Sequence, residues 1–73
     1  MEKKLRFAAH LRKEYADSIY LVAEDLRKAG CNVYAIIELL AIIGVEGESQ
    51  EYLENLNITG ISYFDKDEDI VLH

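Results

Sequence analysis

The apolar positions of this 73-residue chain fall into three patterns, each of which predicts an element of structure. In the first pattern, no Pro or Gly occurs from Glu2 to Ala29, and apolar side chains recur at spacings of three or four, as in an amphipathic helix. These positions are Ala8, Leu11, Tyr15, Ile19, Val22 and Leu26. Gly30 supplies a helix stop. The pattern predicts one long helix, and the alternative is a kink with a second cap at Asp17 or Ser18.

The second pattern is the nearly continuous apolar stretch VYAIIELLAIIGV at positions 33–45, which contains one charged residue. Asn32 is a suitable N-cap and Gly44 a suitable stop, so the stretch predicts a second helix. At 100° per residue, one face of this helix is predicted to be core: Val33, Ile36, Ile37, Leu40 and Ile43. The opposite face is also mostly apolar, and it is predicted to be an oligomer interface: Tyr34, Glu38, Ala41, Ile42 and Val45.

The third pattern covers the C-terminal part of the chain. Ser49 is expected to cap a short third helix that extends to about Asn57. Residues 58–64 are rich in β-branched and aromatic side chains, residues 65–68 are polar, and residues 70–72 are apolar, which is typical of a β-hairpin. The predicted fold is therefore a single α+β domain over residues 1–73, with a long N-terminal helix, a buried second helix, a short third helix and a C-terminal antiparallel hairpin.

The chain is short for the number of apolar residues that it contains. A domain of this length buries only roughly 60% of the surface that its unfolded chain exposes. Half of the residues are apolar, and the second helix is apolar on both sides. We therefore expect a homodimer or a larger assembly. A subunit with a purely structural role in such an assembly is one of the possible functions.

The same features indicate a cytoplasmic protein. One cysteine, Cys31, cannot form an internal disulfide, which fits a reducing compartment. No long apolar run follows the basic N-terminal residues, so a signal peptide is not expected. The apolar stretch at 33–45 would span about 20 Å as a helix, whereas a membrane core is about 30 Å thick. No membrane segment is therefore predicted.

Charge is distributed unequally along the chain, whose net charge is −6. Residues 1–30 contain seven Lys and Arg against five Asp and Glu, whereas residues 31–73 contain one against nine. An acidic half of this kind predicts a basic protein partner, and one version is an inhibitor that mimics phosphate in the nucleic-acid groove of its target. The predicted partner-binding residues are Glu46, Glu48, Glu51, Glu54, Asp65, Asp67 and Asp69.

A DNA-associated regulator is the alternative function. Basic side chains fall on one stripe of the predicted first helix, where they could bind an anion such as a phosphate: Lys3, Arg6, His10 and Lys13. The order of helices and hairpin from residue 33 to 72 resembles a winged helix, with residues 49–56 in the place of the recognition helix. That segment contains no Lys or Arg, and its Glu51 and Glu54 would face phosphates, so direct nucleic-acid binding is the less favoured prediction.

Catalytic and metal-binding patterns are incomplete in this sequence. His10 and His73 lie at opposite ends of the chain, no Ser has a nearby His, and no glycine-rich phosphate loop occurs. The alternating carboxylates from Asp65 to Asp69 resemble the start of a calcium-binding EF-hand loop, but Ile70 stands where that loop requires glycine. The sequence predicts a non-enzymatic protein without a cofactor or a metal.

Overall fold

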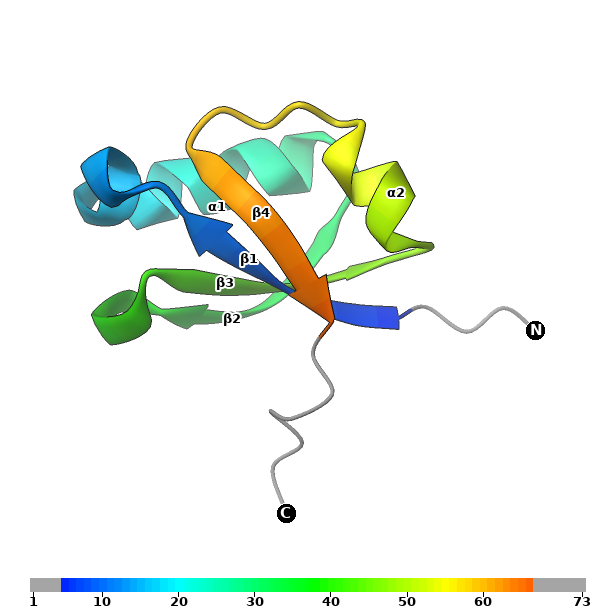
Figure 1. Ribbon diagram of the computed structural model, residues 1–73, viewed down its shortest axis with the longest axis horizontal. Helices are drawn as coiled ribbons and strands as arrows, with labels where there is room; N and C mark the ends of the chain where they lie inside the picture. Colours follow the sequence, from blue (N-terminus) through cyan, green and yellow to red (C-terminus); the bar gives the residue numbers. More distant parts are fainter. Residues whose placement is uncertain (1–4, 67–73) are drawn as a thin grey trace, which may run out of the picture.

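The computed structural model describes residues 5–66 as a four-stranded sheet with two helices (Figure 1). The elements are β1 (Leu5–Leu11), the 3₁₀ segment η1 (Lys13–Ser18), α1 (Ile19–Lys28), β2 (Asn32–Ile37), the 3₁₀ turn η2 (Glu38–Leu40), β3 (Ile42–Gly47), α2 (Gln50–Glu54) and β4 (Ile61–Lys66). All strand pairs are antiparallel, and the strand order is β2-β3-β1-β4. This order of elements is the split βαβ, or ferredoxin-like, topology. The predicted fold is therefore wrong.

The predicted N-terminal helix is replaced by a strand and a shorter helix. The segment LRFAAHL forms β1, with Phe7, Ala9 and Leu11 in the core below the helices. Alternate residues of β1, such as Arg6, point to the other face of the sheet, because successive side chains of a strand face opposite ways. Arg12 has extended backbone angles and separates β1 from η1. A period of two therefore governs this segment, rather than the helical period.

The second part of that prediction is closer to the structure. Ile19, Val22 and Leu26 lie on the buried face of α1, as the helical spacing indicated. Ser18 occupies the N-cap position of α1, so the helix starts where the alternative placed a second start, but the Ser18 side chain makes no capping hydrogen bond. Gly30 has φ +96°, a conformation that glycine adopts without steric cost, and the chain turns there into β2.

The predicted second helix is wrong, because the stretch VYAIIELLAIIGV forms the hairpin β2-η2-β3. Two cross-strand pairs of this hairpin face the helices, Val33 with Val45 and Ile36 with Ile43. Leu40, predicted to be core, lies instead on the turn with 62% of its surface exposed. β-branched side chains fit a pleated sheet well, and they are concentrated in both arms of this stretch.

One core lies between the sheet and the two helices. Its largest fully buried side chains come from β1, β3, α1 and α2: Phe7, Ile43, Val45, Leu26 and Leu53. Both helices pack on the same face of the sheet, and the opposite face, here called the open sheet face, has no helix over it in residues 5–66 (Figure 1). The described residues include no buried polar or charged side chain.

The C-terminal part is partly as predicted. Ser49 caps α2, since its hydroxyl accepts a hydrogen bond from the backbone N–H of Tyr52 at 3.1 Å, but the helix ends at Glu54 instead of Asn57. Residues 61–66 form a strand, β4, which pairs with β1. Residues 70–72, the second arm of the predicted hairpin, lie outside the described residues. The order of elements required for a winged helix is therefore absent from residues 5–66.

Candidate protein-interaction surfaces

The predicted basic stripe does not form, and two of its members lie on the open sheet face in contact with other side chains. The Arg6 guanidinium lies 3.5 Å from the Glu46 carboxylate, and its Cζ is 4.9 Å from the centre of the Tyr34 ring. The His10 ring stacks on Tyr63 with centroids 4.3 Å apart. Lys13 belongs to η1, beyond the end of β1, and Lys3 lies outside the described residues. Residues 5–66 therefore contain no helical row of cations that corresponds to the predicted stripe.

Small residues in the middle of the open sheet face allow these side chains to lie flat on it. Gly44 pairs with Ala8 across β3 and β1, and a Cβ at Gly44 would stand 2.7 Å from Cζ of Tyr34. The Tyr34 ring therefore occupies the space above Gly44. Glu46, predicted to bind a partner, accepts a hydrogen bond from the Asn32 amide at 2.8 Å on the same face. Glu46 is thus separated from the acidic residues of α2.

Three of the other predicted partner-binding residues gather around α2. Glu48 just before the helix and Glu51 and Glu54 within it are all exposed, and Tyr52, which stands among them in the sequence, is 43% exposed. We call these four residues the acidic α2 surface. Asp65 is exposed on β4, and Asp67 and Asp69 lie outside the described residues. The structure therefore brings together part of the predicted set.

The acidic α2 surface is held by contacts on the inner side of the helix. Leu53 is fully buried in the core. The Gln50 amide donates hydrogen bonds to the backbone oxygen of Phe64 at 2.8 Å and to the Glu54 carboxylate at 3.2 Å. Together with the Ser49 cap, these contacts fix a helix of only five residues, which would not be stable alone.

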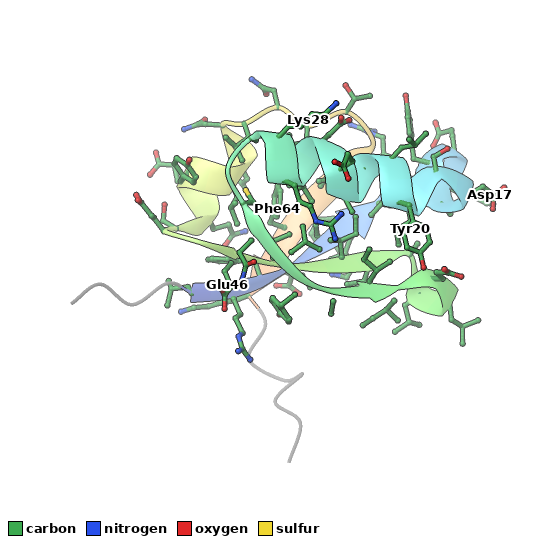
Figure 2. The ribbon with its side chains drawn as sticks, turned by 180° about the vertical axis from the view of Figure 1, so that it is seen from behind. Asp17, Tyr20, Lys28, Glu46 and Phe64 are labelled. Atoms are coloured by element: carbon green, nitrogen blue, oxygen red, sulfur yellow. The ribbon has the colours of Figure 1, made fainter. Side chains whose placement is uncertain are left out.

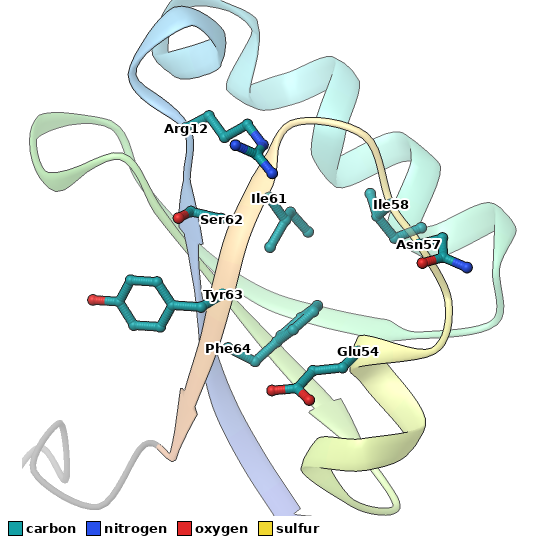
Figure 3. A pocket seen from close by; sticks show the side chains of 8 residues that line it. All are labelled: Arg12, Glu54, Asn57, Ile58, Ile61, Ser62, Tyr63 and Phe64. Atoms are coloured by element: carbon teal, nitrogen blue, oxygen red, sulfur yellow. The ribbon is translucent and has the colours of Figure 1, made fainter.

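A shallow groove of about 320 Å³ lies beside this surface, along β4 (Figure 3). Arg12 and Glu54 lie at opposite ends of the groove, and the apolar side chains Ile58, Ile61 and Phe64 lie between them. Its volume is near the lower limit for small-molecule sites, which enclose most of their ligand. The groove is open to solvent, so it fits an extension of a protein contact better than an enclosed ligand.

The largest exposed apolar side chains lie near the tip of the β2-β3 hairpin and on α1. Leu39 is 94% exposed, Leu21 69% and Tyr20 59%. The Tyr20 side chain reaches from α1 to the hairpin, where its hydroxyl donates a hydrogen bond to the Glu38 carboxylate (Figure 2). This contact, and next the negative charge of Glu38, raise the pKa of the Tyr20 hydroxyl above its ordinary value of 10.

Two hollows run side by side between α1 and the hairpin, and they share Tyr20. One lies against β2 and the other against η2 and η1. We call this region the α1-β2 seam and define it by the residues Ala16, Asp17, Ile19, Tyr20, Arg27, Val33, Tyr34, Ala35, Ile36, Glu38 and Leu39.

The five predicted oligomer-interface residues do not form one surface. Val45 is fully buried in the core, and Ile42 is half-buried on β3. Ala41 closes the hairpin turn with φ 54°, while Glu38 is exposed on η2. Sequence reasoning missed Tyr20, Leu21 and Leu39, although the first two stood off the apolar face of the predicted helix and could have marked an exposed apolar site.

The described residues contain no group of three or more His, Cys, Asp or Glu side chains placed to hold a metal ion. Cys31 is buried. None of the helices in residues 5–66 is long and apolar enough to cross a membrane. Comparisons of the chain with family models, curated proteins and solved structures found no match. The topology alone does not assign a function, because ferredoxin-like folds support many unrelated ones.

Proposed function

We propose that this protein is a non-enzymatic, cytoplasmic protein-interaction module that docks on a basic protein partner through the acidic α2 surface. The observation that carries the proposal is the exposed side chain of Tyr52 on α2, a helix anchored by buried Leu53, with exposed Glu48, Glu51 and Glu54 within four residues of Tyr52 in the sequence. Tyr is enriched among the residues that contribute most to protein-protein affinity, and surrounding charges select and steer the partner.

The charge around this helix supports a basic partner. No Lys or Arg occurs in the sequence between Lys28 and Lys66, so the neighbouring chain segments add carboxylates without adding cations. Arg12 lies at the far end of the groove from Glu54. A basic segment could therefore approach α2 with its Lys or Arg side chains near the carboxylates. Proteins that bind nucleic acid carry such basic surfaces, and a phosphate-mimicking inhibitor is one form that this function can take.

Binding of a fluorescent Lys- and Arg-rich peptide, followed by anisotropy, tests the proposal. The variant Glu48→Gln/Glu51→Gln should weaken binding several-fold, and Tyr52→Ala should weaken it as well. The matched control is Glu24→Gln/Asp25→Asn, which removes two exposed carboxylates from α1 instead. If both double variants weaken binding equally, the peptide responds only to net charge and the acidic α2 surface is not its site.

Direct nucleic-acid binding is not included in the proposal, because Arg6 and His10 are engaged with Glu46, Tyr34 and Tyr63 on the open sheet face. A gel-shift experiment with nonspecific DNA at low salt should show no complex. A complex that Arg6→Ala abolishes would contradict the proposed function.

A further inference from the structure

The edge of the sheet at β2 lacks the charged residues and the proline that commonly keep an edge strand from pairing with another chain. β3 lies on one side of β2, and no strand of residues 5–66 lies on the other. Asn32–Ile37 includes no charged residue and no proline, which commonly block edge pairing. A bulge at Tyr34 interrupts the register of β2 with β3, and regular pairing continues over Ala35–Ile37. The other edge strand, β4, ends in Asp65 and Lys66.

Exposed apolar side chains lie next to this edge. Tyr20 on α1 and Leu39 on η2 are both exposed and line the same hollow between the helix and the hairpin. Exposed apolar side chains that lie together on a small protein mark an interaction site. The α1-β2 seam therefore offers backbone groups for strand pairing and apolar side chains for packing in the same place.

The two ends of the seam carry opposite charges. Asp17 and Glu38 line it at the start of α1, where Tyr20 contacts Glu38. Arg27 lines it near the other end of the helix, seven residues or about 10 Å further along the axis. Figure 2 shows Asp17 far from the end of α1 that carries Lys28, the residue after Arg27. The exposed ion pair of Arg27 with Glu24 at 3.3 Å is of a kind that contributes little and can rearrange.

Opposite charges at the two ends of the seam favour a binding partner with the same two charges in reverse order. We propose that a second copy of this chain docks on the α1-β2 seam in antiparallel orientation, related by a two-fold axis. In that orientation the acidic end of each seam faces Arg27 of the other copy, and β2 of one copy extends the sheet of the other. A two-fold contact is self-complementary, so both charge contacts form at once. This interface is distinct from the acidic α2 surface, and either can fail without the other.

Sedimentation equilibrium of the full chain in about 0.15 M salt tests the arrangement. The wild type should be a dimer. Arg27→Glu and Glu38→Arg should each weaken the dimer by about tenfold, because each places like charges opposite one another twice. An equimolar mixture of the two variants should regain the wild-type affinity, because the mixed dimer has opposite charges at both contacts. The two substitutions change net charge in opposite directions, so a general charge effect cannot weaken both.

Circular dichroism checks that both variants fold. We expect both to fold because the side chains of Arg27 and Glu38 are exposed. Asp17→Arg replaces Glu38→Arg if the latter is unfolded. A wild type that stays monomeric at high concentration overturns the proposal and assigns the seam to another occupant or none. A dimer that neither variant weakens, or a mixture that is no stronger than the single variants, overturns the antiparallel arrangement.

Discussion

The hydroxyl of Tyr20 donates a hydrogen bond to the carboxylate of Glu38, and this contact joins the first turn of α1 to the turn between β2 and β3. The two residues are 18 positions apart in the sequence. Their contact exists only because the segment before Glu38 is a strand that returns along α1. The same contact fixes the protonated form of the tyrosine, since an ionised hydroxyl could not donate.

We expect the substitution Glu38→Gln to lower the pKa of Tyr20 towards its ordinary value of 10, because it removes the negative charge and weakens the hydrogen bond. The raised pKa also has a consequence for stability. Since the folded chain favours the neutral hydroxyl, the contribution of this pair is fully present below the unfolded pKa and is lost as pH rises through the folded pKa.

Absorbance of tyrosinate during an alkaline titration measures this change, and the difference between wild type and Tyr20→Phe assigns the signal to Tyr20. A Tyr20 midpoint that does not move in Glu38→Gln would show that the contact is not formed in solution.

Truncation of Leu40 and Ile43 distinguishes the hairpin from a helix in the same stretch. Ile43→Ala should lower the free energy of unfolding by about 2–5 kcal/mol, because Ile43 is fully buried in the core. Leu40→Ala should lower it by less than about 0.5 kcal/mol, as expected for an exposed position. Urea denaturation measures both. Similar losses at the two positions would indicate that they share one buried face, as in the predicted helix.

The sequence contained a signal against that helix. Val33, Ile36, Ile37, Ile42 and Ile43 are β-branched, and Glu38 divides them into two short runs. Such runs favour strands, but periodicity alone cannot separate a buried strand from a buried helix when both are nearly all apolar. The bulge at Tyr34 also shifts the alternation within β2, so a strict period of two was not visible.

The sequence predicted those features correctly that depend on neighbouring residues rather than on tertiary packing. The buried face of α1, the turn at Gly30 and the cap at Ser49 depend on spacing or on a single residue, and all three were predicted correctly. The boundary at Arg12 was missed because the segment LRFAAHL also fits a helical spacing. This segment forms a strand because it pairs with β3 on one side and β4 on the other.

The candidate surfaces also divide into residues grouped by sequence and residues grouped by tertiary packing. Grouping of Glu48, Glu51 and Glu54 follows from their closeness in sequence, and the structure leaves all three exposed within or just before α2. Tyr20 and Leu39 come together only through the packing of α1 on the hairpin, which no local pattern contains. Glu46 was grouped with the acidic residues by sequence, but strand alternation places it on the open sheet face beside Arg6.

Gly44→Ala should destabilise the protein by about 1–3 kcal/mol, because the added Cβ would stand 2.7 Å from Cζ of Tyr34 and the ring must move. The cost arises from that side chain, so it should largely disappear when Tyr34→Ala is also present. A double-mutant cycle based on urea denaturation measures the coupling. An equal cost in both backgrounds would mean that the Tyr34 ring does not cover Gly44.

Leu53 and Tyr52 are adjacent on α2, and their substitutions should separate stability from binding. Leu53→Ala should lower the free energy of unfolding by about 2–5 kcal/mol, since Leu53 is fully buried and anchors the helix to the core. Tyr52→Ala should change stability far less, because its side chain is exposed, yet it should weaken binding of the basic peptide.

Thermal unfolding and peptide anisotropy on the same samples measure the two effects, with Leu53→Ala assayed at a temperature where it remains folded. If Tyr52→Ala destabilises the protein as much as Leu53→Ala, Tyr52 is part of the core and α2 presents a different face to solvent. If Tyr52→Ala leaves both stability and peptide binding unchanged, the acidic α2 surface lacks the central contact that the proposed function requires.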